Sequence, residues 1–208
     1  DFGARFMARV LAHFVKDIDR ELVVLVATSG DTGSAVAHGF FGVPGISVFV
    51  LYPSGKVSAL QEKMLTTMGG NITALEVRGT FDDCQRLVKS AFMDDELRKR
   101  FFLTSANSIN IARLLPQSFY YFYAVSRLVR DSRTPVVISV PSGNFGNVTA
   151  GLYAKQMGLK VKRFIAPTNA NDIVPHYYET GKFTPKPSQH TLTNAMDVGN
   201  PSNFARIQ

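Results

Sequence analysis

Two short glycine-containing segments carry the residues best suited to bind a charged ligand. Thr28–Gly33 (TSGDTG) follows an apolar run that ends at Ala27, and Pro141–Asn147 (PSGNFGN) follows one that ends at Val140. A stretch with helical patterning begins directly after each segment. The first N–H groups of a helix lack internal acceptors, and the helix dipole makes that end partly positive. Each segment therefore predicts an anion-binding turn, in which glycine lets a ligand approach the backbone.

The common nucleotide, metal and nucleophile motifs do not occur in the sequence. Neither segment has the P-loop spacing G-x-x-x-x-G-K-[ST] or the dinucleotide spacing G-x-G-x-x-G. The four histidines have no metal-ligand spacing, and H-E-x-x-H and G-x-S-x-G are absent. We therefore expect no metal site. For either segment alone, the alternative to an anion-binding turn is an ordinary strand-to-helix turn capped by Ser, Thr or Asn. The presence of two such segments in one chain favours anion binding.

A third polar segment, Thr104–Arg113 (TSANSINIAR), follows a short apolar run and precedes a helical pattern. Asn107 stands near the predicted start of that helix, and Arg113 follows within two turns. A guanidinium donates two parallel hydrogen bonds to a phosphate or carboxylate. The segment therefore adds candidate anion ligands, and the alternative is a helix cap followed by a surface arginine.

Alternating apolar runs and helical patterns predict the elements that position these segments. A long helix is expected at 109–130, in which Pro116 should cause a kink or start a new helix. Its aromatic residues 119–123 are expected in the core. Residues 180–188 are expected to form a surface loop. The pattern predicts an α/β fold with mostly parallel twisted sheets, buried on both faces and flanked by helices. Strands are expected at 22–27, 46–51, 71–77, 101–104, 135–140 and 161–166, and helices at 2–14, 32–41, 58–68, 80–92, 109–130 and 147–157.

Composition narrows the function further. The chain has 208 residues with 45% hydrophobic and 19% charged side chains, which is ordinary globular usage. Its net charge of +7 comes from residues 101–208, which suggests an anionic ligand. The basic residues are scattered, so nucleic acid is disfavoured, and no apolar run is long enough for a membrane helix. The single cysteine, Cys84, allows no internal disulfide and favours a reduced, cytoplasmic setting.

Four motifs in order resemble threonine synthases of the bacterial and fungal branch: ATSGDTGSA (27–35), LYPSGKVSALQEKM (51–64), NSINIARLLPQ (107–117) and PSGNFGN (141–147). Those enzymes use pyridoxal phosphate and have the tryptophan-synthase-β fold, also called fold type II. The resemblance runs from Asp1 to about Arg206. It implies conversion of O-phosphohomoserine and water to L-threonine and phosphate by γ-elimination and β-addition. The implied partner is a small phosphorylated amino acid, and neither nucleic acid nor a membrane is an expected partner. Assembly into a homo-oligomer is possible.

The resemblance also implies a role for each polar segment. The cofactor phosphate would be held by backbone N–H groups of the second glycine loop, and Asp31 would lie beside the 3′-oxygen of the cofactor ring. The first glycine loop would bind the substrate's α-carboxylate, and Thr28, Thr32, Asn107 and Arg113 match positions that bind the substrate's phosphate. The expected cofactor-binding residues are Ser142, Gly143, Asn144, Phe145, Gly146, Asn147 and Asp31, and the expected substrate-binding residues are Thr28, Ser29, Gly30, Thr32, Asn107 and Arg113.

In the resembled family the Schiff-base lysine lies in a stretch like F-K-D-F-G, immediately before the residue that matches Asp1. Lys16 and Lys56 lack those flanking residues. We therefore expect a chain that is incomplete at both ends, has no catalytic residue and is inactive alone. The domains implied are a helix at 1–20 that belongs with the larger domain, a smaller α/β domain at 21–132 and part of the larger, cofactor-binding domain at 133–208.

Two other functions stay open at this stage. A related phospho-lyase of the same fold would eliminate phosphate and release a keto acid. A non-catalytic α/β module would bind a phosphate or nucleotide through the two glycine loops.

Overall fold

The structure is a computed structural model that describes residues 2–28, 30–108, 110–128 and 135–208. Its contacts divide the chain into two compact units, Asp1–Arg113 and Leu114–Gln208. The expected domain boundaries near residues 20 and 132 concern the complete protein and stay a prediction. Within this chain, the division falls between Arg113 and Leu114.

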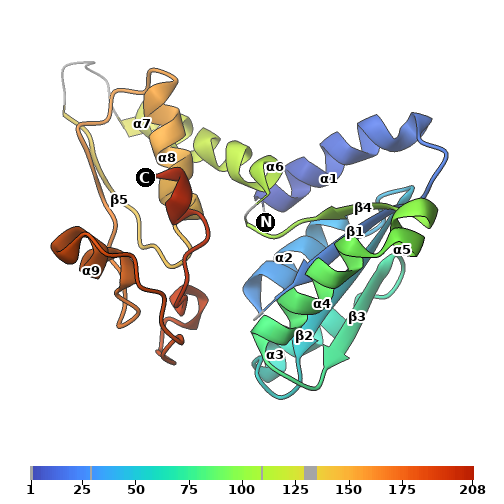
Figure 1. The fold of residues 1–208 in the computed structure, drawn as a ribbon. Helices are drawn as coiled ribbons and strands as arrows, with labels where there is room; N and C mark the ends of the chain where they lie inside the picture. The colour runs from blue at the N-terminus through green and yellow to red at the C-terminus, as the bar shows by residue number, and fades with distance from the viewer. Residues whose placement is uncertain (1, 29, 109, 129–134) are drawn as a thin grey trace. The chain divides into compact units, whose positions relative to one another are not determined.

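Unit 1 is built on a parallel sheet of four strands in the order β3-β2-β1-β4 (Figure 1). The central strand, β1, pairs with a neighbour on each side, and all six of its residues are buried. The run of branched apolar residues LVVLVA fits a strand that is covered on both faces. The strands are β1 (Leu22–Ala27), β2 (Ile46–Pro53), β3 (Ile72–Val77) and β4 (Phe102–Ser105).

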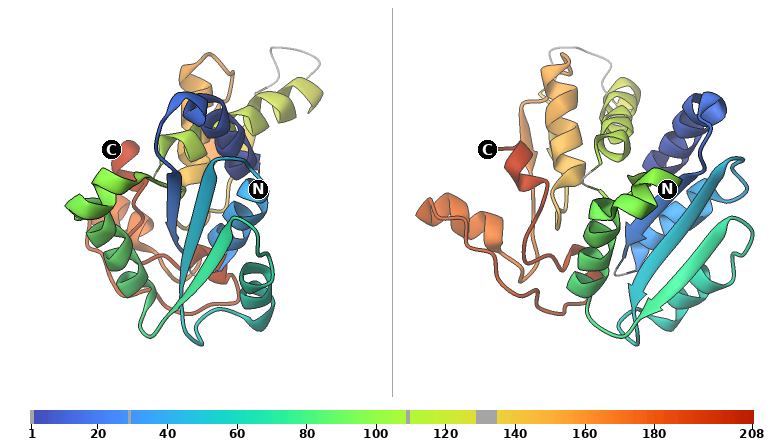
Figure 2. Two further views of the ribbon diagram at one scale, coloured as in Figure 1. Left: turned by 90° about the vertical axis from the view of Figure 1, so that its right-hand side faces the viewer. Right: turned by 45° about the vertical axis from the view of Figure 1, so that its right-hand side comes forward.

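Helices cover both faces of this sheet (Figure 2). Alternate residues of β1 divide between two cores: Val24 and Val26 pack with α1, α2 and α3, whereas Val23 and Leu25 pack with α4. The period of two along a strand produces this division. The helices are α1 (Phe2–Phe14), α2 (Asp31–Phe40), α3 (Ala59–Thr66), α4 (Phe81–Met93), α5 (Asp95–Arg100) and α6 (Ile111–Leu114), with a short 3-10 turn, η1, at Val15–Asp17.

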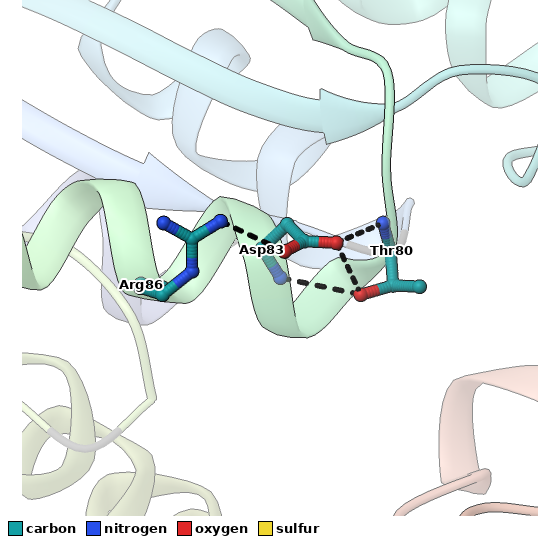
Figure 3. A network of polar contacts seen from close by, with 3 residues as sticks. All are labelled: Thr80, Asp83 and Arg86. Carbon is teal, nitrogen blue, oxygen red and sulfur yellow. Dashed lines mark hydrogen bonds and ion pairs between the residues drawn. The ribbon is translucent and has the colours of Figure 1, made fainter.

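Two of these helices begin with a capping box. Ser58 and Gln61 cap α3, and Thr80 and Asp83 cap α4. The Thr80 hydroxyl accepts from the Asp83 N–H at 3.3 Å, and the Asp83 carboxylate accepts from the Thr80 N–H at 2.8 Å (Figure 3). Hydrogen bonds from Arg86, then from Thr80, lower the pKa of Asp83 to about 2. Thr80 is therefore the N-cap of α4, and the capping box satisfies the amides of Thr80 and Asp83.

Unit 2 contains a parallel pair of strands, β5 (Val137–Ser139) and β6 (Arg163–Ile165). Helix α8 (Gly146–Gln156) packs on α7 (Ser118–Leu128), and a core of nine buried residues includes Tyr121, Phe145 and Phe204. The remaining elements are α9 (Ile173–Thr180) and the 3-10 turns η2 (Leu115–Gln117), η3 (Asn194–Met196) and η4 (Phe204–Arg206).

The parallel α/β fold predicted from the sequence is confirmed, with four differences. Strands β3, β5 and β6 are only partly buried, because helices do not cover both of their faces in this chain. The aromatic run is not all core, since Phe119, Tyr120 and Tyr123 are exposed and Tyr121 is buried. Helix α5 escaped prediction because its DELRKR sequence has little apolar periodicity, and α9 because Pro175 interrupts its first turn.

The 3-10 turn at Pro116 does separate α6 from α7, as predicted, and 180–188 is almost entirely without regular structure. The expected helix at 109–130 extends over Ile109 and residues 129–130, which lie outside the described part of the chain.

Candidate functional site

The second glycine loop joins the end of β5 to the start of α8. Phe145, the residue before α8, has φ 61° and ψ 10°, and no side chain caps the helix there. It is the only non-glycine residue with positive φ among those that the structure describes. Such a conformation is strained for an aromatic residue. The surrounding structure must therefore hold this loop in its shape.

Most backbone N–H groups of this loop have no acceptor among the described residues, whereas the Ser142 N–H donates to the Pro167 carbonyl at 2.9 Å. Those of Gly143, Phe145, Gly146 and Asn147 make no hydrogen bond within the described ranges. They stand at the N-terminus of an 11-residue helix. Free amides at the positive end of a helix dipole form a site for a phosphate. This donor set fits the phosphate group of a cofactor.

Two side chains of the loop serve its internal structure. The Asn147 amide donates to the Pro141 carbonyl at 2.7 Å, and its oxygen accepts from the Val148 N–H at 2.9 Å. Ser142 Oγ lies 2.8 Å from the Val140 carbonyl and 3.1 Å from Asn147 Oδ1. These bonds close the base of the loop. Ser142 therefore serves the shape of the loop, since its N–H also donates to the Pro167 carbonyl, whereas Asn147 keeps a backbone N–H without an acceptor among the described residues.

Tyr121 is a residue of this site that sequence reasoning missed. Its hydroxyl donates to the Asn147 carbonyl at 2.6 Å, and burial raises its pKa to about 12. The ring also packs on Gly151, where a Cβ would lie 2.8 Å from it. Tyr121 thereby fixes the first turn of α8 against α7. The sequence offered a signal only in the aromatic run, which did not distinguish Tyr121 from its neighbours.

The first glycine loop, in unit 1, satisfies part of its own backbone. Thr28 is buried, and its Oγ1 accepts from the Gly30 N–H at 2.9 Å and from the Gly33 N–H at 2.8 Å. Two of the amides expected to bind an anion are therefore engaged within the loop. The amides of Asp31 and Thr32 have no hydrogen bond among the described residues. Ser29, also expected to bind substrate, lies outside the described residues.

Asn107 lies next to this loop, and Arg113 is bonded to the residue before Asn107 in the same unit. The Asn107 amide donates to the Ala27 carbonyl at 2.7 Å and its oxygen accepts from the Ala27 N–H at 3.3 Å. Asn107 therefore ties the end of β1, directly before Thr28, to the end of β4. Arg113 is buried, and its Nη1 donates to the Ala106 carbonyl at 2.6 Å. The structure thus brings Thr28, Asn107 and Arg113 into one neighbourhood.

Asp31 is held by a residue that the sequence analysis did not single out. Gln61 Nε2 donates to Asp31 Oδ1 at 2.8 Å, while Gln61 Oε1 accepts from the Ser58 N–H at 3.0 Å in the capping box of α3. A Cβ on Gly30 would lie 2.4 Å from the end of the Gln61 side chain, which would have to move, and the φ of +141° at Gly30 favours glycine. The spacing of Ser58 and Gln61 was the available signal.

No cluster of three or more His, Cys, Asp or Glu side chains among the described residues could hold a metal ion. A hollow of about 550 Å³ lies at the opposite, amino-terminal edge of the unit 1 sheet. There the Asn71 amide donates to the carbonyls of Phe40 and Ile46. We interpret the residues around that hollow as structural and not as a binding site. No helix within the described ranges has the length and apolar character needed to span a bilayer.

An α/β fold whose strand ends carry a phosphate-binding helix start defines a class of proteins that bind phosphorylated cofactors. The chain belongs to the pyridoxal-phosphate dependent enzyme family, whose model matches residues 1–207.

Individual relatives agree with this family. The threonine synthase of Escherichia coli is 56% identical over 208 residues, which are 100% of this chain and 48% of that protein. The crystal structure of that protein superposes with a TM-score of 0.89, covering 99% of this chain and 48% of that one. The pyridoxal-phosphate-bound threonine synthase from Brucella melitensis is 38% identical with a TM-score of 0.90, covering 99% and 44%.

A more distant structure shares the fold alone. Serine racemase from Dictyostelium discoideum is 15% identical with a TM-score of 0.70, covering 99% of this chain and 62% of that one. The chain spans about half the length of the curated threonine synthases that it matches. The resemblance inferred from the four motifs is therefore confirmed along the whole chain.

Proposed function

We propose that the full-length protein containing this chain is a threonine synthase, converting O-phosphohomoserine and water to L-threonine and phosphate with pyridoxal phosphate as cofactor. The observation that carries this proposal is the 56% identity to the Escherichia coli enzyme over all 208 residues. Pyridoxal phosphate supplies an electron sink for negative charge that develops on the substrate's carbon atoms. The residues of this chain bind, orient and neutralise the phosphate groups.

The second glycine loop is proposed to bind the cofactor phosphate. The N–H groups of Gly143, Phe145, Gly146 and Asn147 are the donors, because they have no acceptor in the described part of the protein. Gly143 and Gly146 carry no Cβ, which at these positions would meet Met196 and Asn203 and displace the loop. The free helix start adds a partial positive charge.

The first loop and its neighbours are proposed to bind the substrate. Arg113 supplies a fixed positive charge for the substrate's phosphate, since its Nη1 is held on the Ala106 carbonyl at 2.6 Å. Asn107 and Thr28 position the end of β1, and the remaining amides of the loop are placed for the α-carboxylate. Thr32 follows on α2. Asp31 is proposed to face the ring oxygen of the cofactor, with its carboxylate fixed by Gln61.

No proton transfer at the substrate's carbons is assigned to a residue of this chain. Lys16 lies in the 3-10 turn η1, and Lys56 lies in the turn after β2, so neither belongs to the two glycine loops. The resemblance places the lysine that attaches the cofactor immediately before Asp1. We therefore propose that this chain alone binds phosphate-like anions without turnover. The proposal includes a reducing, cytoplasmic setting, in which the buried Cys84 stays a thiol.

The test is product analysis with the full-length protein. Supplied with pyridoxal phosphate and O-phosphohomoserine, it should release L-threonine and inorganic phosphate in equal amounts. A keto acid in place of threonine would indicate a phospho-lyase, and the absence of both products together with no visible absorbance from bound cofactor would indicate a non-catalytic module. Either result would overturn the proposal.

A substitution at Arg113 tests the substrate site. In the full-length enzyme, Arg113→Ala should raise KM for the phosphorylated substrate and cost about 1.5–3 kcal/mol in kcat/KM, the range of a charge-assisted hydrogen bond. Arg127→Ala is the matched control, because Arg127 is exposed on α7. Unchanged kinetics for Arg113→Ala would remove this residue from the site.

A further inference from the structure

Residues 196–204 (MDVGNPSNF), here called the brace segment, contact the second glycine loop along its length. A Cβ on Gly143 would lie 2.6 Å from Met196 Cα and 2.8 Å from its carbonyl oxygen. The backbone of the brace segment thus packs directly on the backbone of Gly143. None of the motifs identified in the sequence includes this segment.

The next loop residue is bonded to the brace segment through its side chain. Asn144 Oδ1 accepts from the Ser202 N–H at 2.7 Å and from the Ser202 hydroxyl at 3.0 Å. Both donors belong to one residue, so Ser202 fixes the position and the direction of the Asn144 side chain. These two hydrogen bonds hold the middle of the loop in place.

The last part of the loop meets two buried residues of the brace segment. The Phe204 ring packs edge-on against the Phe145 ring, with centroids 5.9 Å apart, and both side chains are buried. Asn203 is 0% exposed, and its Nδ2 would lie 3.1 Å from a Cβ on Gly146. The strained conformation of Phe145 is therefore held by contacts from outside the loop.

Asp197 anchors the brace segment to the loop that follows β6. Its carboxylate accepts from the Thr191 N–H at 2.9 Å, the Thr191 hydroxyl at 2.6 Å, and the side-chain amides of Asn169 at 2.8 Å and Asn171 at 3.3 Å. Asn171 also donates to the Gln189 carbonyl at 3.0 Å. Because Asp197 follows Met196 directly, this network sets where Met196 meets Gly143.

We propose that the brace segment sets the geometry of the cofactor-phosphate loop, with Ser202 and Asp197 as positioning residues. Four consecutive residues, Gly143 to Gly146, each meet a residue of the brace segment, and Phe145, the N-cap residue of α8, makes no side-chain cap hydrogen bond. The brace segment holds the middle of the loop without accepting from the amides of Gly143, Phe145 or Gly146, which have no acceptor among the described residues. This inference rests on the proposed function of the loop.

The experiment measures pyridoxal phosphate binding to the full-length apoprotein by absorbance titration. Ser202→Ala should raise Kd about three- to tenfold, the equivalent of one neutral hydrogen bond, and Asp197→Asn about ten- to hundredfold, since it removes charge-assisted bonds. Ser202→Thr should restore the wild-type Kd because it keeps the hydroxyl. Asn200→Ala, an exposed position between the two, is the matched control.

Thermal melting and amide hydrogen exchange separate positioning from general stability. The exposed Ser202 variants should melt with the wild type, while the amides of residues 143–147 exchange faster in Ser202→Ala bound to cofactor. Wild-type Kd and exchange in Ser202→Ala would overturn this inference, as would a weaker Kd that Ser202→Thr fails to restore. If the Asp197→Asn variant does not fold, the comparison of Ser202→Ala with Ser202→Thr still tests the inference. Failure of the wild-type protein to bind the cofactor would instead overturn the proposed function.

Discussion

The two glycine loops have similar sequences but differ in whether their backbone N–H groups have hydrogen-bond acceptors within the protein. Both follow a strand, both have the spacing G-x-x-G, and both precede a helix. In the first loop, the Thr28 hydroxyl accepts from the amides of Gly30 and Gly33. In the second, the amides of Gly143, Phe145, Gly146 and Asn147 have no acceptor within the described ranges.

This difference shows that a glycine spacing alone does not make an anion site. The first loop is shaped from within by its own threonine, which consumes two donors. The second is closed at its base by Ser142 and Asn147 and held at Gly143 to Gly146 by the brace segment. Neither support accepts from the amides of Gly143, Phe145, Gly146 or Asn147, so these donors do not have to leave an internal acceptor to bind a ligand.

The largest expected effect comes from Gly143→Ala. The new Cβ would collide with the backbone of Met196, 2.6 Å away, and backbone cannot rotate out of the way. We expect a loss of about 3 kcal/mol in unfolding free energy and a cofactor Kd raised at least about tenfold. Urea denaturation and absorbance titration of the full-length protein measure the two quantities.

Gly55→Ala provides the control for this substitution. A Cβ there meets nothing within 4 Å, although φ is +65°. This substitution should lower the free energy of unfolding by about 1 kcal/mol, because of backbone strain alone, and should leave cofactor binding unchanged. Equal effects of the two substitutions would contradict the packing of the brace segment on the loop.

The next largest effect is expected for Thr28→Val. Valine has the shape of threonine but cannot accept from the amides of Gly30 and Gly33, and Thr28 is 1% exposed. Burying two unsatisfied donors should lower the unfolding free energy by about 2–3 kcal/mol. Thr28→Ser keeps the oxygen and should recover most of this loss. A Thr28→Val protein as stable as the wild type in urea would show that the first loop is not closed by its threonine.

A smaller effect is expected for Tyr121→Phe, which removes the hydrogen bond to the Asn147 carbonyl at the second loop. The loss should be about 1 kcal/mol at neutral pH. The pKa of Tyr121 is raised from 10.0 to about 12, so its contribution is fully present below about pH 10 and is lost as pH rises toward 12. The wild type should therefore lose stability in this alkaline range more steeply than Tyr121→Phe.

Spectrophotometric titration at the phenolate band, with denaturation curves from pH 8 to 12, measures this dependence. Tyr123→Phe on the same helix is the control, because Tyr123 is 69% exposed. If Tyr121→Phe and the wild type lose stability in parallel, the buried hydroxyl does not support the second loop.

The sequence predicted the fold well where local signals and burial agreed. Every residue of β1 matched its expected bounds, because an unbroken apolar run can be accommodated only between two covering layers. By contrast, α5 gave no signal, since five of its six residues are charged and it carries no apolar stripe.

The candidate site was predictable in its loops and not in their supports. The positions of both glycine loops follow from strand-to-helix boundaries. Whether their amides are free depends on Thr28 in one loop and on Met196 and Ser202 in the other. Ser202 lies 58 residues from Asn144 in sequence, and no local pattern encodes such a contact. Gln61 was hidden for the same reason, because its contact with Asp31 depends on tertiary packing.

The start of α4 provides a third helix start for the comparison, one whose Thr80 and Asp83 amides are bonded internally, and it carries the smallest expected effect. The Asp83 carboxylate already binds the Thr80 N–H and hydroxyl there (Figure 3). Its pKa is lowered from 3.8 to about 2, mainly by hydrogen bonds from Arg86 and Thr80. A carboxyl group with a depressed folded-state pKa contributes stability above the unfolded value, and that contribution is lost as pH falls through the folded value.

The wild type should therefore lose a small increment of stability between about pH 4 and pH 2 that Asp83→Asn lacks. The increment is small and falls with added salt, because the Arg86 pair is exposed. Urea midpoints across this range measure it, with Asp82→Asn as the control in the same turn. Added phosphate should protect the second loop from hydrogen exchange and leave the Thr80 and Asp83 amides at the start of α4 unchanged, because side-chain oxygens of the capping box already accept from them. Equal protection at both helix starts would show that internal capping does not compete with anion binding.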